Sequence, residues 1–401
     1  MRGIQKGETG CLWRDKLVTS RKDEAGPLVR VCDGLSCVLA ESESLLDRLT
    51  NVLAGRARVV ATPCLGRCEQ APTVLVGHHA LAQASSEEVV KAVAADRFEA
   101  APPTAPNLLT YTLQGGYRLL RACLDGRRSP EEIIAVLHDA GLRGLGGSGQ
   151  PTAAKWRRVK NQPGPHALVV DGTESRPGTF KDRAYLEHDP HRFLEGALIA
   201  AWAVDAAELF IVLRDDYSHL QGLLIKEIIA AEDSGLTGGR SVQMRREASS
   251  CRQIEDTSST LVNGVETLYW VRDIVERGAA WWRGFGRRGY SGLISFSVSG
   301  RVSEPGVKIA PAGITARELI DEFCGGMMEG HVFWAYLPGS AAGPLLPASQ
   351  ANIPLDFGSL EPYGAQIGAA ALIVLSDHDA WRESTLDSTG APTDRKIPHR
   401  E

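Results

Sequence analysis

The first hundred residues alternate between short apolar runs and amphipathic stretches. Runs of β-forming residues lie at 28–31, 59–61 and 73–76, and apolar positions with helical spacing lie at 45–53 and 87–95. Short β-rich runs predict strands, and apolar positions repeating every three to four residues predict helices. This part of the chain is therefore predicted to form a small unit of mixed α and β structure.

A proline-rich segment separates this unit from the rest of the chain. Pro102, Pro103 and Pro106 stand close together among small and polar residues. Prolines remove backbone donors and favour an extended chain. We therefore predict a first domain at residues 1–100 and a linker at 101–115.

The middle of the chain alternates strand and helix patterns. Ser129, Pro130 and Glu132 form a capping-box sequence that predicts the start of a helix. Further strands are predicted at 167–170 and 209–213, and further helices at 192–207 and 220–232. This alternation is typical of a parallel α/β sheet, so residues 116–286 are interpreted as a Rossmann-like domain of the nucleotide-binding type.

From residue 292 the pattern changes to alternating apolar and polar positions. Two hairpin strands followed by a crossing helix at 315–323 are predicted there. We interpret residues 287–352 as a small β-grasp domain and residues 353–401 as a separate C-terminal segment.

Composition and charge exclude several classes of protein. The 401 residues suffice for two to three domains, and 44 Lys and Arg against 49 Asp and Glu give a net charge of -5. This balance argues against a nucleic-acid or anionic-membrane partner. The apolar run at 197–204 is far shorter than the roughly 18 residues that a membrane helix needs. Without the apolar core of a secretory signal near the amino terminus, a cytoplasmic location without membrane insertion is expected.

Half of the eight cysteines form two close pairs. Four residues separate Cys32 from Cys37, three separate Cys64 from Cys68, and each pair follows a predicted strand. Four thiolates are the ligand set of a 2Fe-2S cluster, whereas zinc ribbons usually have about two residues within each pair. The spacing therefore favours iron and sulfur over zinc or over four structural cysteines. The other cysteines are interpreted as small core residues: Cys11, Cys123, Cys251 and Cys324.

A glycine-rich loop follows the capped helix at residues 141–149. Glycine loops next to a helix start let backbone N–H groups approach a phosphate. We take four glycines as candidate cofactor-binding residues: Gly144, Gly146, Gly147 and Gly149. Lys155 stands just beyond them and would add a positive charge, although a solvated surface lysine is an equally good interpretation.

Several motifs resemble known electron-transfer proteins. Residues 31–37 and 63–72 resemble the thioredoxin-like 2Fe-2S ferredoxin domain, and residues 141–156, 174–183 and 261–268 resemble the FMN- and NADH-binding subunit of respiratory complex I. The likeness covers nearly the whole chain. It is greatest to the fused beta, or diaphorase, subunit of soluble NAD-dependent molybdenum formate dehydrogenases.

The resemblance implies a multi-domain α/β fold with three parts. They are a thioredoxin-like 2Fe-2S domain, a Rossmann-like FMN/NADH domain and a small β-grasp (SLBB-like) domain. It implies FMN and NAD(H) as cofactors besides the 2Fe-2S cluster. Expected partners are a molybdenum formate dehydrogenase alpha subunit with a small 2Fe-2S gamma subunit, or complex I-type subunits.

The resemblance also gives roles to three polar residues, whereas no residue is assigned to catalysis. Asn263 and Thr267 would lie near the flavin phosphate, or would instead cap a helix that runs into residue 268. Glu174 would hydrogen-bond cofactor or substrate, or would instead form a salt bridge with Lys181 or Arg183.

The chain departs from the family at functional places. Asp171-Gly172-Thr173-Glu174 replaces Asn-x-Asp-Glu, Gln150 replaces an aromatic residue, residues 245–251 replace Tyr-Ile-Cys-Gly-Glu-Glu, and the polar stretch 381–401 has no cysteine where the family carries a 4Fe-4S site. Lost flavin hydrogen bonds, at roughly 0.5–1.5 kcal/mol each, would weaken FMN binding by about one to three powers of ten. The resemblance thus describes a divergent, C-terminally truncated member.

Three functions remain open from the sequence. The first is a subunit that passes electrons between NAD(H), FMN and a 2Fe-2S cluster, as an NADH dehydrogenase or diaphorase subunit. The second is a non-catalytic scaffold that keeps the 2Fe-2S domain but binds FMN poorly. The third is a 2Fe-2S carrier fused to an unrelated ligand-binding domain.

Overall fold

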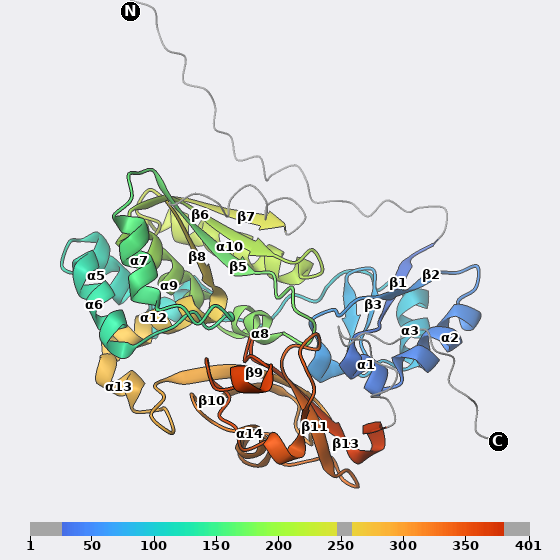
Figure 1. The fold of residues 1–401 in the computed structure, drawn as a ribbon. Helices are drawn as coiled ribbons and strands as arrows, with labels where there is room; N and C mark the ends of the chain where they lie inside the picture. The colour runs from blue at the N-terminus through green and yellow to red at the C-terminus, as the bar shows by residue number, and fades with distance from the viewer. Residues whose placement is uncertain (1–25, 247–258, 381–401) are drawn as a thin grey trace, which may run out of the picture.

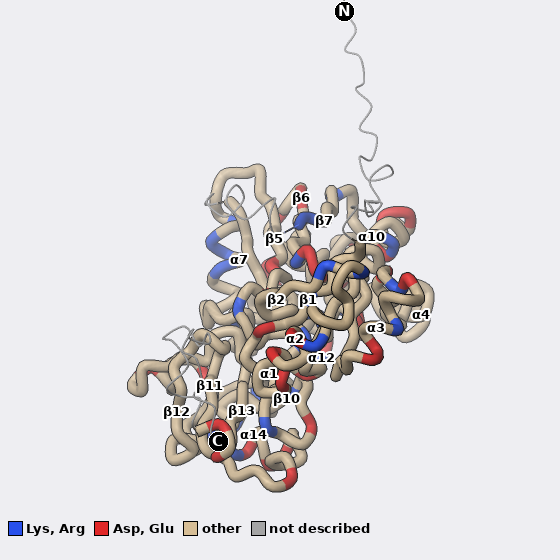
Figure 2. The backbone as a smooth tube through the Cα atoms, turned by 90° about the vertical axis from the view of Figure 1, so that its right-hand side faces the viewer, with Lys and Arg blue, Asp and Glu red and all other residues tan. Residues whose placement is uncertain are grey.

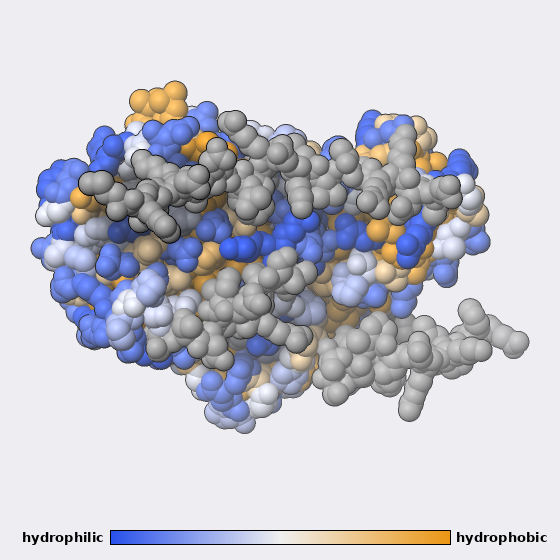
Figure 3. Space-filling model, turned by 90° about the horizontal axis from the view of Figure 1, so that it is seen from above, coloured by the Kyte–Doolittle hydropathy of each residue, from blue (hydrophilic) through white to orange (hydrophobic). Residues whose placement is uncertain are grey.

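The computed structural model describes residues 26–246 and 259–380, which form three lobes (Figure 1). Each lobe is built around its own β-sheet. In the described residues, no helix is both long and apolar enough to cross a membrane. The face seen from above is largely hydrophilic with smaller hydrophobic areas (Figure 3).

The first lobe is an α/β unit with a four-stranded sheet in the order β2-β1-β3-β4. Strand β1 pairs in parallel with β2 and antiparallel with β3. Its core joins Val29 of the sheet to Leu49 and Val89 of two helices. The predicted strands and helices are all present. The elements are β1 (Leu28–Cys32), α1 (Leu35–Leu39), α2 (Ser42–Val52), β2 (Arg58–Thr62), η1 (Cys68–Gln70), β3 (Val74–Val76), β4 (His79–Leu81) and α3 (Ser86–Ala94).

The second lobe contains an all-parallel sheet in the order β7-β6-β5-β8. Its first helices are α4 (Leu108–Leu113), α5 (Arg118–Leu124), α6 (Pro130–Ala140) and α7 (Thr152–Lys160). The sheet and its helices follow as β5 (His166–Gly172), α8 (Lys181–His188), α9 (Pro190–Ala203), β6 (Ala206–Leu213), α10 (Ser218–Asp233), β7 (Ser241–Arg246), β8 (Thr260–Gly264), α12 (Val265–Arg277) and α13 (Ala279–Arg283). The predicted parallel α/β sheet is therefore confirmed.

Local sequence signals explain the ends of these elements. The capping box at the start of α6 is present, since Glu132 N donates to Ser129 Oγ at 3.2 Å and Ser129 N donates to the Glu132 carboxylate at 3.0 Å. Helix α9 begins after Asp189, whose side chain caps it, and ends before β6. Helix α4, capped by Asn107, lies inside the segment predicted to be a linker.

The third lobe is a five-stranded sheet in the order β10-β9-β13-β11-β12. The predicted hairpin and crossing helix are present, because β9 and β10 pair antiparallel and α14 follows them. Strand β13 pairs in parallel with β9 and antiparallel with β11. The elements are β9 (Leu293–Gly300), β10 (Gly306–Pro311), α14 (Ala316–Phe323), β11 (Phe333–Gly339), β12 (Leu346–Pro347), η2 (Ala348–Gln350), η3 (Glu361–Tyr363) and β13 (Ala371–Ser376).

The central place of β13 corrects the expected end of this lobe. A boundary at residue 352 would divide the sheet, because β13 lies between β9 and β11. Residues 353–380 are therefore part of the third lobe and not a separate C-terminal segment. The remainder of that segment, residues 381–401, lies outside the described residues.

The first lobe contacts both of the others. Leu35 and Leu39 of α1 pack against Leu337 and Ile373 of the third sheet, and the guanidinium of Arg183 on α8 donates to Gly66 O at 3.0 Å. In Figure 2, acidic and basic positions are interspersed along the elements, with a basic run on α7. The loops that carry the cysteine pairs thus lie where the lobes meet.

Candidate functional site

The structure brings the four predicted cysteine ligands together. Cys32 ends β1, Cys37 lies in α1, Cys64 follows β2 and Cys68 begins η1; all are buried and free. The sulfur atoms of Cys64 and Cys68 are 3.4 Å apart, and the thiols of Cys37 and Cys64 are close enough to Cys32 to shift its pKa. Two loops therefore present four thiols to one point, as their spacing predicts.

Glycines in both loops permit this approach. A Cβ added at Gly34 would lie 3.1 Å from the Cβ of Cys64 and 3.4 Å from the sulfur of Cys32. At Gly66, which has a φ of +66°, an added Cβ would lie 2.2 Å from the hydroxyl of Tyr217. The backbone N–H of Gly178 also donates to the Cys64 sulfur at 3.5 Å.

The close packing of these thiols shifts the pKa of three of them. Hydrogen bonds from neighbouring cysteines, together with burial, raise the pKa of Cys32 and Cys68. Hydrogen bonds from Cys32 and Cys68 lower the pKa of Cys64. Four buried thiolates repel one another unless a cation compensates them, and metal coordination deprotonates thiols. The donor set fits a 2Fe-2S cluster, whose two irons together take four cysteine thiolates.

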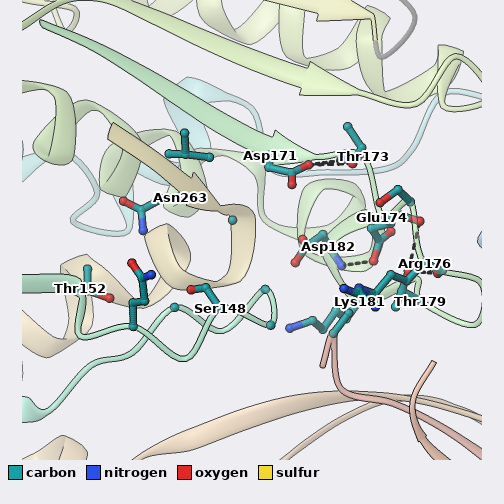
Figure 4. A pocket seen from close by; sticks show the side chains of 18 of the residues that line it. Ser148, Thr152, Asp171, Thr173, Glu174, Arg176, Thr179, Lys181, Asp182 and Asn263 are labelled. Atoms are coloured by element: carbon teal, nitrogen blue, oxygen red, sulfur yellow. Dashed lines mark hydrogen bonds between the residues drawn. The ribbon is translucent and has the colours of Figure 1, made fainter. Parts of the chain in front are cut away.

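A pocket of about 400 Å³ lies in the second lobe, at the carboxyl ends of β5 and β8 (Figure 4). The strand order changes direction at β5: β6 and β7 are added on one side of it, and β8 is added on the other. Ligands of parallel α/β sheets bind at such switch points. The lining comes from the glycine loop, the segment after β5, the start of α8 and the end of β8. Its polar side chains include Ser148, Thr152, Lys155, Asp171, Thr173, Glu174, Arg176, Thr179, Lys181, Asp182 and Asn263.

The predicted glycines shape this pocket in different ways. Gly144, Gly146 and Gly147 line it, whereas Gly149 does not. A Cβ at Gly147, whose φ is +113°, would lie 3.0 Å from the carbonyl carbon of Gly368, and one at Gly149 would lie 2.6 Å from the Phe357 ring. The glycines therefore let the loop pack against the third lobe while leaving its backbone open to the pocket.

Three further predicted residues surround the same loop. Lys155 lines the pocket, where burial lowers its pKa, and its ammonium donates to the Val262 carbonyl. The Asn263 side chain also lines the pocket and accepts from Trp156 Nε1 at 3.0 Å. Thr267 is fully buried outside the pocket lining, and its hydroxyl oxygen accepts the Leu145 N–H at 2.9 Å. Helix α12 has Gly264 at its N-cap without a side-chain bond, so capping by Asn263 or Thr267 is wrong.

Glu174 lines the pocket and caps a helix. Its carboxylate accepts the N–H groups of Asp182 at 2.9 Å and Arg183 at 3.2 Å, and the Tyr217 hydroxyl at 3.0 Å. The salt bridge with the side chain of Lys181 or Arg183 that the sequence allowed is therefore replaced by bonds to the backbone at the start of α8. Burial raises the pKa of Glu174.

The sequence did not single out two charged residues as part of the site. Lys181 is 2% exposed; its ammonium forms an ion pair with Glu266 and donates to Leu145 O at 2.8 Å. Asp182 is 6% exposed, and burial raises its pKa well above the ordinary value. No local pattern marks either residue, because charged residues at a helix start are usually solvated.

Unpartnered polar atoms show that the pocket suits a polar ligand. Asp182 Oδ1 and Thr152 Oγ1 are buried without a hydrogen-bond partner, and buried polar atoms normally have one. FMN carries a phosphate, hydroxyls and ring N–H groups that could satisfy both atoms and the loop N–H groups. The residues present therefore fit FMN.

Two of the departures from the resembled pattern lie in the lining of this pocket. The N–H and hydroxyl of Thr173 donate to Asp171 Oδ1 at 3.1 and 2.7 Å, so the polar groups of these two residues are hydrogen-bonded to each other within the pocket wall. Gln150 belongs to the lining. Strand β7 includes Arg245 and Arg246, while residues 247–251 of the replaced segment lie outside the described residues.

One loop joins the pocket to the cysteine cluster. Glu174, Arg176 and Thr179 line the pocket. The next residue, Phe180, is fully buried and packs against Cys64 and Cys68. One wall of the pocket is thus also a wall of the thiol site, so groups bound at the two sites would lie close together.

A buried charge network holds these two sites together. The Arg183 guanidinium pairs with Glu69 of the first lobe and with Glu187 of its own helix, the latter at 2.7 Å. His219 Nε2 lies 2.8 Å from the Glu187 carboxylate. Burial alone would raise the pKa of Glu187, but the His219 hydrogen bond and the Arg183 charge lower it to about 2.

Acid is expected to weaken this network. A pKa depressed from the ordinary 4.5 to about 2 adds stability that is complete above about pH 5 and is lost as the pH falls towards 2. This contribution is at most roughly 3 kcal/mol. Glu187→Gln should therefore flatten the pH dependence of the unfolding free energy between pH 5 and 2. Glu87→Gln, which changes a 77% exposed side chain, should leave that dependence unchanged; equal curves for the two variants would contradict this reasoning.

Iron analysis is expected to give about two iron atoms per chain, with no 4Fe-4S cluster. Burial raises the pKa of both Cys123 and Cys324 to about 11, which keeps them as neutral thiols. Cys11 and Cys251 lie outside the described residues. About six iron atoms per chain, the sum of both cluster types, would show that a second cluster forms.

Two known families match the parts of the chain that carry the two sites. Residues 19–96 match the thioredoxin-like [2Fe-2S] ferredoxin family, and residues 137–270 match the Nuo51 FMN-binding domain. The chain thus carries both a 2Fe-2S domain and an FMN-binding domain.

Comparison with individual proteins extends the match. The chain is 33% identical over 311 residues to the NADH-quinone oxidoreductase F 2 subunit of Rhizobium meliloti (strain 1021), covering 69% of this chain and 74% of the relative. It is 32% identical over 306 residues to the NADH-quinone oxidoreductase F subunit of Escherichia coli (strain K12), covering 67% and 68%. A crystal structure of an air-oxidized NAD+-reducing [NiFe]-hydrogenase matches with a TM-score of 0.74 at 25% identity, covering 89% of this chain and 70% of that chain.

Proposed function

This chain belongs to the family of NADH-quinone oxidoreductase F subunits, and from that premise we propose that it passes electrons between NAD(H), FMN and a 2Fe-2S cluster. The observation that carries the proposal is the shared wall between the two sites. Gly178 N donates to the Cys64 sulfur at 3.5 Å, and neighbouring Thr179 lines the pocket. A short path between cofactors suits an electron-transfer protein better than a scaffold.

Each part of the pocket has a defined task in this proposal. When bound, FMN supplies the exchange between two-electron hydride chemistry and one-electron transfer. The N–H groups of the glycine loop and the Lys155 ammonium bind the phosphate. Asp182 Oδ1 accepts hydrogen bonds from polar groups of the cofactor, and the Thr152 hydroxyl accepts or donates them. Phe180, fully buried, keeps water from the thiols on the side that faces the pocket.

FMN affinity is the property to measure, because some of the polar residues expected to contact the flavin ring are replaced in this chain. With Thr173 bound to Asp171, we expect less than one FMN per purified chain, and NADH oxidation by ferricyanide that increases when FMN is added. A scaffold that has lost flavin would bind no added FMN and its rate would not change. Acid release of the fluorescent flavin gives the stoichiometry independently of activity.

We propose a molybdenum-containing formate dehydrogenase alpha subunit as the partner, together with a small 2Fe-2S gamma subunit. The support is the motif resemblance and the presence of the 2Fe-2S and FMN domains in one chain. The fold match to an NAD+-reducing [NiFe]-hydrogenase makes a nickel-containing partner the competing possibility, and complex I-type subunits are another. Affinity purification of the tagged chain followed by metal analysis would separate them. Copurified molybdenum supports the formate dehydrogenase, whereas nickel without molybdenum would contradict it.

A further inference from the structure

Three metal-binding side chains meet outside both cofactor sites. His331 precedes β11, and Asp377 and His378 follow β13. These strands are antiparallel neighbours with Phe333 opposite Ser376, so their ends bring the three residues together. One ligand atom from each residue lies within 4.8 Å of the others.

The hydrogen bonds of His331 fix which of its nitrogens is free. Its Nδ1 lies 2.8 Å from Ser376 Oγ. The Ser376 hydroxyl donates to Asp379 Oδ2 at 3.2 Å, so it has no second proton to give to His331. With the Ser376 proton directed to Asp379, His331 Nδ1 carries the hydrogen and its Nε2 carries the lone pair that a metal needs.

Buried groups fix the position of Ser376, whose hydroxyl oxygen is the hydrogen-bond partner of His331. Asp379 is 2% exposed; it accepts Arg301 Nε at 3.0 Å and Arg301 Nη2 at 2.8 Å. It also accepts the backbone N–H of Ser376 at 3.1 Å. Arg301, Asp379 and Ser376 thus form a chain of hydrogen bonds that orients a ligating histidine, as the outer partners of metal sites commonly do.

The other two ligands are placed to complete the site. Asp377 Oδ1 accepts the Val332 N–H at 3.0 Å, while Oδ2 lies 4.0 Å from His378 Nε2. The rings of His331 and His378 have centroids 4.5 Å apart. Ligand atoms on a tetrahedral zinc lie about 3.3 Å from one another, given bonds of about 2.0 Å. The side chains of Asp377 and His378 are about half exposed, so small rotations can close this difference.

We propose that His331, Asp377 and His378 bind a divalent first-row transition metal such as zinc, with water completing the coordination. Two imidazole nitrogens favour zinc, nickel or copper over magnesium or calcium. Three protein ligands and an open position are a known arrangement for zinc. The metal would connect the start of β11 to the end of β13.

Zinc binding to the full chain tests this proposal. The 2Fe-2S cluster is kept in place, so that its four cysteines do not bind the added zinc. After equilibrium dialysis against zinc, we expect about one zinc per chain with the iron content unchanged. His378→Gln and Asp377→Asn should each weaken zinc binding at least tenfold, and Ser376→Ala should weaken it about 10- to 100-fold. His138→Gln is the matched control, because His138 is exposed and contacts Asp139 alone among carboxylates in the described chain.

A second measurement distinguishes ligation from general surface binding. With the cluster oxidised and therefore silent in electron paramagnetic resonance (EPR), bound Cu²⁺ should show coupling to imidazole nitrogens that His378→Gln reduces and His138→Gln does not. His378 and Asp377 are exposed, so these variants should fold, which thermal unfolding without metal verifies. Wild-type chain that takes up no zinc, or ligand variants with wild-type affinity, would overturn the proposal.

Discussion

Cys64→Ser is expected to remove the 2Fe-2S cluster and, with it, reduction of the chain's iron by NADH. The Cys64 sulfur lies 3.4 Å from the Cys68 sulfur and accepts the Gly178 N–H, and both Cys32 and Cys68 influence its pKa, which places it in the middle of the four thiols. A serine hydroxyl ionises far less readily than a thiol and is a harder ligand. Visible absorbance and iron content of anaerobically reconstituted protein should both fall to near background.

The matched control for this substitution is Cys123→Ser. Cys123 is equally buried but lies in the core of the second lobe, away from the other thiols. Its replacement should leave absorbance and iron content at wild-type values. Full iron retention by Cys64→Ser, or a wild type that reconstitutes with zinc alone, would show that the ligand assignment is wrong.

Lys181→Met is expected to lower the free energy of unfolding by about 3–5 kcal/mol, because it leaves the buried Glu266 carboxylate without a counter-ion. Lys181 and Glu266 have side chains that are 2% and 1% exposed. Lys181 also binds the Leu145 carbonyl of the glycine loop at 2.8 Å, and Glu266 accepts the Ser295 N–H of the third lobe at 2.8 Å. The same change should therefore loosen the loop and weaken FMN binding.

Lys155→Met is the control, because Lys155 lines the same pocket and donates to a carbonyl rather than to a carboxylate. Its effect on unfolding should stay within about 1 kcal/mol, while FMN affinity falls through loss of a phosphate contact. Denaturant unfolding and flavin fluorescence titration measure the two effects separately. A Lys181→Met variant as stable as Lys155→Met would contradict the role given to the ion pair.

Short-range patterns in the sequence predict much of the fold. The capping box at Ser129 and the strand before Cys32 are local features, and both are found where the pattern places them. The pairing of β13 with β9 was not predicted, because β9 is distant in sequence and local periodicity does not report which strands pair. The expected boundary at residue 352 was therefore too early.

In the candidate site, too, local features were predictable from the sequence and long-range contacts were not. The four cysteines are predictable because they form two close pairs and each pair follows a predicted strand. For Glu174 the sequence allowed a contact to cofactor or substrate, or a salt bridge with Lys181 or Arg183. Its carboxylate instead accepts backbone N–H groups at the start of α8 and the Tyr217 hydroxyl. The burial of Lys181 and Asp182 depends on the glycine loop and on α12, which the residues flanking them do not reveal.

The central claim, that electrons from NADH reach the 2Fe-2S cluster of this chain through FMN, is tested most directly by an anaerobic NADH titration of the reconstituted chain with EPR detection. Loaded with FMN, the chain should develop the signal of a reduced 2Fe-2S cluster, approaching about one spin per chain. Without FMN the signal should not appear, and Cys64→Ser should give none under either condition. An FMN-loaded chain whose cluster stays oxidised under NADH but is reduced by dithionite would contradict the claim.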